Sequence, residues 1–383
     1  MDRTYTLTRL SQKFKVHRII ALLGPRQCGK TTLAKSYCQT EEHFARRNYF
    51  DLESPNDLAR LSDPYNTSND LSGLIVIDEV QRAPELFPIL RVLHDDDPSK
   101  RFLILGSASK HLLHQSSESL TGRIHYEEIT PFRYDEVGEW KNLLFRGGFP
   151  RSYLAENDED SLQWREDYVR TLLEQDIPNL GFRIPATHLR RFWMMLANCH
   201  GQIFNAHEIG QSLDLSAPAM RRYLDLLSDM LMVRILQPWH ANIGKRQVKS
   251  PKSYIRDSGI FHYLTHINNR DALALSPKRG ASFEGFVLEE LIRITRVKPE
   301  DCFFWRTHAG AELDLLLLIG GKKIGFEIKM TDKPKVTKSM HTSLSNCELD
   351  HLYLVHPGDV TWSLGDKMTA LCLTDINRLG DDH

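Results

Sequence analysis

The sequence predicts an α/β fold for the first third of the chain, with a buried parallel sheet flanked by helices. Short apolar runs, among them RIIALLG (18–24), LIVIDE (74–79) and RFLILGSAS (101–109), alternate with helical stretches. Continuous Ile, Leu and Val runs are typical of strands buried on both faces. A chain of 383 residues exceeds one domain of usual size, so we expect three domains, at residues 1–150, 151–240 and 241–383.

The pattern changes after residue 150, where long helical stretches replace the strands. A helix, a short turn at 214–216, a second amphipathic helix and the strand-like VRILQPW predict a helical lid followed by a winged helix-turn-helix. The third region combines a helix in ASFEGFVLEELIRITR, a hairpin over 312–329 and a strand at HLYLVHP.

Composition narrows the class of protein. Hydrophobic residues make up 41% of the chain and charged residues 26%, which is the balance of a globular protein. No apolar run approaches the roughly 20 residues of a membrane span, and the N-terminus lacks a secretory signal, so we expect a cytoplasmic protein without membrane association. The six cysteines form no C-x-x-C pair, which predicts reduced thiols. A net charge of -1 means that nucleic-acid binding would need local basic patches.

The segment GPRQCGKT (24–31) matches the phosphate-binding pattern G-x-x-x-x-G-K-[ST] and lies between an apolar strand and a helix. Backbone N–H groups and the helix N-terminus would surround the phosphates of ATP, with Lys30 at the β and γ oxygens and the Thr31 hydroxyl on Mg²⁺. The residues expected at the nucleotide are Gly24, Pro25, Arg26, Gln27, Cys28, Gly29, Lys30, Thr31 and Thr32.

Two carboxylates follow the apolar run LIVI. We expect Asp78 to hold Mg²⁺ and Glu79 to act as the base that activates the attacking water. Ser107 ends another apolar strand and would orient the water if the strands are neighbours; otherwise it is an ordinary polar strand end.

These motifs resemble those of AAA+-like P-loop ATPases, in particular a prokaryotic group in which the ATPase is joined to a C-terminal domain of unknown function. The resemblance covers nearly the whole chain and rests on GPRQCGKTT, NYFDLE, LIVIDEVQ, LILGSAS, SLTGR, FRGGFP, PWHANIGKR, PKSYIRDSG, FEGFVLEELI and GAELDLLLL. It implies that Arg123 is an arginine finger for a neighbouring subunit in a homo-oligomeric ring such as a hexamer, and that Pro150 contacts adenine. The alternatives are a surface arginine and a plain turn.

The predicted hairpin places charged residues opposite one another. Gly320-Gly321 is a two-residue turn, which sets Asp314 opposite Glu327 and Glu312 opposite Lys329. A side-chain period of two puts these four residues on one charged face. The other face would be the core and would carry Leu313, Leu315, Leu317, Ile319, Ile324, Phe326 and Ile328. Opposed carboxylates repel, so a cation such as Mg²⁺ would stabilise Asp314 and Glu327.

The hairpin resembles the core of PD-(D/E)xK nucleases, which have a restriction-endonuclease-like fold. That resemblance implies that Asp314, Glu327 and Glu284 are metal ligands and that Lys329 orients or activates the nucleophile. Alternatively, these are ordinary charged residues of a hairpin, and the fold is kept without cutting.

Basic residues near the second helix of the winged motif could contact DNA phosphates: Arg221, Arg222, Lys245, Arg246, Lys249 and Lys252. The alternatives are a lid or subunit contact and a solvated linker. The leading hypothesis is an ATP-dependent, Mg²⁺-dependent nuclease acting on DNA. The competing ones are a nucleotide-switched regulator that binds DNA or protein without cleaving, and a remodelling or signalling ATPase without nucleic acid.

Overall fold

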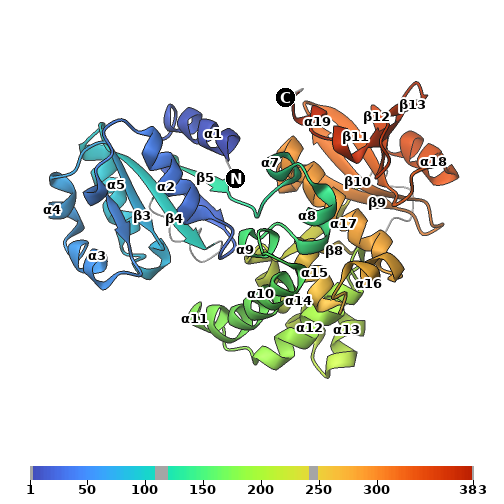
Figure 1. The fold of residues 1–383 in the computed structure, drawn as a ribbon, viewed down its shortest axis with the longest axis horizontal. Helices are drawn as coiled ribbons and strands as arrows, with labels where there is room; N and C mark the ends of the chain where they lie inside the picture. The colour runs from blue at the N-terminus through green and yellow to red at the C-terminus, as the bar shows by residue number, and fades with distance from the viewer. Residues whose placement is uncertain (1–2, 108–119, 241–248, 382–383) are drawn as a thin grey trace. The chain divides into compact units, whose positions relative to one another are not determined.

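The computed structural model describes residues 3–107, 120–240 and 249–381, which form two compact units (Figure 1). The first unit comprises Met1–Phe132 with Asp229–Leu231, and the second comprises Arg133–Ser228 with Met232–His383. The division near residue 132 differs from the boundaries expected at 150 and 240. Residues 133–150 belong to the second unit, and strands on the two sides of residue 240 pair within it.

The first unit contains a parallel sheet which, among the described residues, has five strands in the order β2-β3-β4-β1-β5. The strands are β1 (Ile19–Gly24), β2 (Tyr49–Asp51), β3 (Leu74–Asp78), β4 (Arg101–Ser107) and β5 (Ile124–Glu128). The helices are α1 (Thr4–Phe14), α2 (Lys30–Thr40), α3 (Pro55–Arg60), α4 (Pro64–Asn69) and α5 (Leu86–Asp96). The predicted parallel sheet with flanking helices is confirmed.

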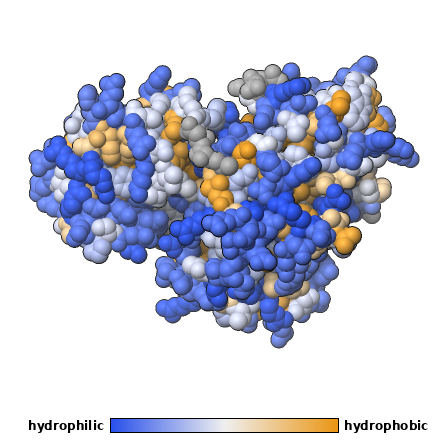
Figure 2. All heavy atoms as spheres, in the orientation of Figure 1, coloured by the Kyte–Doolittle hydropathy of each residue, from blue (hydrophilic) through white to orange (hydrophobic). Residues whose placement is uncertain are grey.

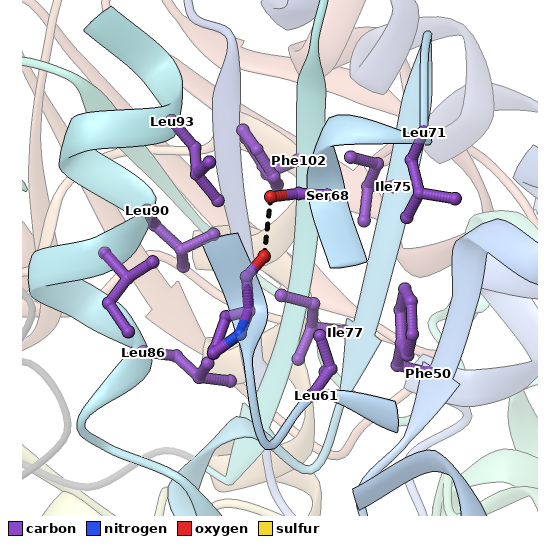
Figure 3. Close-up of a pocket in the computed structure, with 12 residues that line it drawn as sticks. Phe50, Leu61, Ser68, Leu71, Ile75, Ile77, Leu86, Leu90, Leu93 and Phe102 are labelled. Atoms are coloured by element: carbon purple, nitrogen blue, oxygen red, sulfur yellow. Dashed lines mark hydrogen bonds between the residues drawn. The ribbon is translucent and has the colours of Figure 1, made fainter. Parts of the chain in front are cut away.

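Apolar side chains of the sheet pack against α5 to form the core of this unit. Figure 3 shows a cavity in that core, lined by residues that include Phe50, Ile75, Leu90 and Phe102. The one hydrogen bond drawn there runs from the Ser68 hydroxyl to the carbonyl of Pro64, at 2.6 Å. The cavity has a volume of about 20 Å³, which is the size of a single water molecule. It is therefore a packing void, too small for a ligand.

The second unit is built around a mixed sheet of nine described strands in the order β13-β14-β12-β11-β10-β9-β7-β8-β6. Its strands are β6 (Gln202–Ile203), β7 (Val233–Pro238), β8 (Lys252–Ile255), β9 (Cys302–Arg306), β10 (Glu312–Ile319), β11 (Lys322–Ile328), β12 (His351–His356), β13 (Trp362–Gly365) and β14 (Met368–Cys372). Its helices are α7 (Tyr134–Val137), α8 (Trp140–Arg146), α9 (Pro150–Tyr153), α10 (Asp158–Thr171), α11 (Ile177–Asn179), α12 (Ala186–Asn198), α13 (Ala206–Leu213), α14 (Ala217–Asp229), α15 (Ser258–Leu264), α16 (Arg270–Leu275), α17 (Arg279–Thr295), α18 (Lys338–Asn346) and α19 (Arg378–Asp381).

The helix-turn-helix-strand order predicted before residue 240 is present as α13, a turn, α14 and β7. Asp214 makes the turn in the left-handed region, at φ 56°. Strand β7 pairs antiparallel with β8 and parallel with β9. Because β7 lies between these two strands, the middle and C-terminal regions share one sheet.

The segment FRGGFP has a structural explanation within the second unit. The N–H of Gly148 donates to a carboxylate oxygen of Asp257 at 2.8 Å, and a Cβ on Gly147 would come within 2.1 Å of that side chain. The buried guanidinium of Arg165 donates to the carbonyls of Gly259, at 3.0 Å, and Phe145, at 3.5 Å. These contacts fix the FRGGFP turn against the RDSG turn that begins at Arg256.

The surface is mostly hydrophilic over the face that Figure 2 shows, with hydrophobic residues in small separate groups. Singly exposed apolar side chains such as Val16, Leu275 and Val360 are ordinary for a folded protein. Among the described residues, no helix has both the length and the hydropathy needed to cross a bilayer.

Candidate functional site

Three strands of the first unit bring the predicted catalytic residues to one edge of the sheet. Strand β4 lies between β1 and β3, and its last residue, Ser107, is in register with Gly24 at the start of the phosphate loop. Asp78 is the last residue of β3. Because the strands are parallel, their carboxyl ends meet, and the phosphate loop, Asp78 and Ser107 lie along the same edge.

The phosphate loop is held in shape by contacts that only certain residues allow. The ammonium of Lys30 donates to the carbonyls of Gly24 and Pro25, at 2.9 Å each. Gly29 adopts φ 99°, which favours glycine, and a Cβ on Gly24 would lie 2.2 Å from the carbonyl of Ile129. The two glycines of the motif are therefore required by backbone geometry.

Helix α2 presents an uncapped N-terminus to the loop. Its N-cap residue, Gly29, makes no side-chain cap, so the first N–H groups are available to phosphate oxygens. The thiol of Cys28 donates to the carbonyl of Ile129 at 3.4 Å and burial raises its pKa, while its backbone N–H donates to the carbonyl of Pro25 at 3.4 Å. Arg26 forms an exposed ion pair with Glu53 at 3.3 Å, and Thr32 is exposed.

Asp78 is buried and accepts hydrogen bonds from two hydroxyl groups. The Thr31 hydroxyl donates to Asp78 Oδ2 at 2.9 Å, and the Tyr49 hydroxyl donates to the same oxygen at 2.8 Å. Burial and the Asp78 charge raise the pKa of Tyr49, so the phenol stays protonated and able to donate. Sequence reasoning missed Tyr49; the signal was its place at the start of the apolar run in NYFDLE.

Glu79 follows β3 in a left-handed conformation, at φ 57°. Its carboxylate accepts a hydrogen bond from the Gln81 side-chain amide, and the Gln81 carbonyl oxygen accepts one from the N–H of Ser107 at 3.4 Å. Burial and the charge of Asp78 raise the pKa of Glu79, while Lys30 opposes the shift. Gln81, which sequence reasoning also missed, therefore links Glu79 to the end of β4.

The side chains at this edge suit Mg²⁺ with a nucleotide. Thr31 and Asp78 offer a hydroxyl and a carboxylate oxygen 2.9 Å apart, and oxygen donors of this kind are what Mg²⁺ prefers. The uncapped helix and Lys30 supply the positive groups that phosphates need.

Arg123 and Pro150 lie outside the phosphate-loop motif in the sequence, and the structure shows the element to which each belongs. Arg123 precedes β5 and forms a bidentate ion pair with Asp95 of α5, at 3.0 and 2.9 Å; this lowers the pKa of Asp95 to about 2. Pro150 is the first residue of α9, in the second unit. The arginine-finger and adenine-contact roles stay predictions.

The hairpin of the second unit has the predicted register from Leu315 to Ile319, and the predicted pairs Asp314–Glu327 and Glu312–Lys329 lie beyond the end of this ladder. Ile319 faces Lys322 and Leu315 faces Phe326, and both turn glycines, Gly320 and Gly321, have positive φ. The predicted separation of a core face from a charged face is wrong, because pairing with β9 is irregular between Leu313 and Leu316. Leu313 therefore packs in the same cluster as Leu316, whereas strict alternation would place it on the face of Leu315.

Asp314 and Glu327 are buried, each only 6% exposed. Asp314 Oδ2 accepts a hydrogen bond from the N–H of Ile328 at 2.8 Å, and Lys329 forms an ion pair with Glu327 Oε1 at 2.8 Å. Within the described chain, the buried Glu327 Oε2 has no hydrogen-bond partner. Burial and the neighbouring Asp314 raise the pKa of Glu327, whereas Asp314 and Glu327 together raise that of Lys329 to about 12 against the effect of burial.

Glu284 approaches this pair from α17 together with residues that the sequence did not suggest. Tyr254 donates to Glu284 Oε1 at 2.8 Å, and the Lys252 ammonium lies 3.9 Å from the same oxygen. Lys252 also forms an ion pair with Glu312. Burial and the charge of Asp314 raise the pKa of Glu284, while Lys252 opposes the shift. Burial lowers the pKa of Lys252, but the surrounding carboxylates, Glu284 first, outweigh this and leave it raised.

The prediction that Lys252 contacts DNA phosphates is wrong, because its side chain is only 2% exposed and is directed to the carboxylates. Arg221, Arg222 and Lys249 are exposed, while Lys245 and Arg246 lie outside the described residues.

The acidic residues of the second unit do not form a ready three-ligand metal site. No group of three or more His, Cys, Asp or Glu side chains in the described ranges is placed to hold a metal ion. Glu284 and Glu312 are directed to Lys252 and Tyr254, which leaves Asp314 and Glu327 as the neighbouring pair.

Comparison with known proteins places the chain in a family. Residues 16–138 match the model of an AAA domain, and residues 137–271 and 279–376 match two models described as domains of unknown function. Two relatives are each 46% identical over 99% of this chain and 86% of their own length: Mb2031c of Mycobacterium bovis and Rv2008c of Mycobacterium tuberculosis. A Walker-type ATPase of Pyrococcus abyssi has 15% identity and a TM-score of 0.46 over 69% of this chain and 95% of its own. The chain therefore belongs to the family of these mycobacterial proteins and carries, at residues 16–138, an AAA-type P-loop ATPase domain.

Proposed function

We propose that the chain hydrolyses ATP with Mg²⁺ bound by Thr31 and Asp78, and that ATP turnover controls a metal-dependent nuclease site for DNA on β10 and β11. The chain would act in the cytoplasm as a homo-oligomeric ring. The proposal combines the ATPase domain with the acidic cluster of the second unit, which consists of Glu284, Glu312, Asp314 and Glu327 together with Lys252 and Lys329.

The observation that carries the ATPase part is the 2.9 Å hydrogen bond from Thr31 to Asp78, which links the phosphate loop to the end of β3. Glu79, the next residue, would take a proton from the attacking water, and Lys30 would leave the loop carbonyls for the β and γ oxygens. Bound Mg²⁺ would neutralise charge on the phosphates. Gln81 would hold the Glu79 carboxylate in position.

The second site is supported by Asp314 and Glu327 on paired strands and by Lys329 beside Glu327. Lys329 pairs with one oxygen of Glu327, and the other oxygen, Oε2, has no hydrogen-bond partner within the described chain, so it offers a ligand position beside Asp314. A divalent ion at this pair would supply charge to a phosphodiester, and Lys329 would orient the attacking water. The exposed Arg221 and Arg222 on α14 are candidate DNA contacts.

A second candidate function is a nucleotide-switched regulator that binds DNA or a protein partner without cutting. It is favoured by the absence of three converging metal ligands among the residues that the structure describes. In that case the acidic cluster would have a structural role, in which its ion pairs stabilise the second unit.

One assay separates the two. The purified chain is mixed with linear and circular DNA, with Mg²⁺ or EDTA and with or without ATP, and the DNA is resolved on a gel. The nuclease proposal expects Mg²⁺-dependent cutting that Asp314→Ala and Lys329→Ala abolish while ATP turnover persists. DNA left intact under every condition supports the regulator instead.

A further inference from the structure

Lys252 is buried, and a buried ammonium destabilises the fold unless anionic or polar groups compensate its charge. Its side chain is 2% exposed, and burying an ammonium without compensating partners is strongly unfavourable. Its partners come from three elements: Glu312 of β10 in an ion pair, Glu284 of α17 at 3.9 Å and the hydroxyl of Tyr254, also of β8, at 3.5 Å. Strand β8, which is not part of the hairpin, thus places the positive charge of Lys252 inside the acidic cluster.

The direct ion pairs of the two lysines fall into two parts of the cluster, although the charge of Asp314 acts on both lysines. Lys329 contacts Glu327 on β11, whereas Lys252 contacts Glu312 and Glu284. Arg306 of β9 lies 3.6 Å from the second oxygen of Glu312, so Glu312 has cations on both oxygens. The unpartnered acceptor, Glu327 Oε2, belongs to the other part, beside Asp314.

We propose that Lys252 is a built-in cation that takes the place of a divalent ion between Glu284 and Glu312. Divalent-cation binding is thereby confined to Asp314 and Glu327. This inference rests on the proposed function in one respect, because it treats the acidic cluster as a cation site. Lys252 is a positioning residue here: it is too deeply buried to reach a DNA phosphate.

Counting bound Mn²⁺ tests the proposal. The full chain would be titrated without nucleotide and followed by the EPR signal of free Mn²⁺, with Asp78→Asn in every sample to silence the phosphate-loop site. We expect one ion per chain with Lys252 present and a second ion in Lys252→Met, because loss of the ammonium leaves Glu284 and Glu312 to a divalent ion. Lys252→Arg, the charge-preserving control, should bind one ion.

The outcomes distinguish this proposal from the nuclease. If Lys252→Met binds the same number of ions with unchanged affinity, the built-in cation is refuted while the nuclease stands. If the chain with Lys252 binds none and Lys252→Met binds one, the built-in cation is supported and the metal-dependent nuclease is refuted.

A second variant serves if Lys252→Met does not fold, as judged by circular dichroism. Glu312 is already paired by Lys252 and Arg306, so Glu312→Gln should keep the ion with its affinity changed less than about threefold. Loss of the ion in Glu312→Gln would make Glu312 a ligand and overturn the proposal.

Discussion

The hydroxyl of Thr31 donates a hydrogen bond to Asp78, 47 residues further along the chain, at 2.9 Å. This hydrogen bond joins the two residues that we expect to hold Mg²⁺. Its position makes the roles of the surrounding residues testable one by one.

Glu79→Gln should lower the turnover number for ATP by about a hundredfold or more while nucleotide affinity is kept, because the amide cannot accept the proton of the attacking water. Lys30→Ala should also remove turnover, but by weakening nucleotide binding. Phosphate release and fluorescent-nucleotide binding distinguish the two. Wild-type turnover in both variants would remove the catalytic assignment of this edge.

The pH profile of ATP turnover should reflect Glu79. Burial and Asp78 raise its pKa, so the neutral acid persists to higher pH than in an exposed glutamate. Since the base must be ionised to work, turnover should rise with pH across that raised pKa and fall on the acidic side. A kcat profile measured above and below neutrality tests this. An acidic limb at the ordinary glutamate pKa near 4.5 would contradict it.

Tyr49→Phe should destabilise the first unit by about 1 kcal/mol, because buried Asp78 loses one of its two hydroxyl donors. It should also raise the Mg²⁺ concentration needed for half-maximal ATP turnover, since Thr31 is then the one hydroxyl donor that orients Asp78 Oδ2. Denaturant titration and an Mg²⁺ series measure the two effects. Tyr65→Phe is the control, because Tyr65 is exposed and donates to Asp96.

Arg123→Ala should reduce ATP turnover by on the order of a hundredfold if Arg123 reaches a neighbouring subunit, because the transition-state charge is then uncompensated. Stability should change little, since the Arg123–Asp95 pair is solvent-exposed. Asp95→Ala is the matched control: it breaks the same pair, leaves the arginine and should retain turnover. Equal turnover in both variants would assign Arg123 to the surface of its own subunit.

Local chemistry made parts of both sites predictable. The spacing of Gly24, Gly29 and Lys30 between a strand and a helix identified the phosphate loop, because the loop functions through its own backbone. The Gly320-Gly321 turn fixed the hairpin register, because two positive-φ residues allow one short connection.

The other features of the two sites depended on which segments, distant in sequence, come into contact in the fold. Sequence alone determined the phosphate loop, the acidic end of β3 and the hairpin register from Leu315 to Ile319, since each follows from adjacent residues or from the geometry of a short turn. The tertiary structure alone decided that Tyr49 and Gln81 support Asp78 and Glu79, that an irregularity at Leu313 breaks the alternation, and that Lys252 enters the acidic cluster. Strand order and the burial of a charge come from long-range packing, which no local pattern of residues encodes.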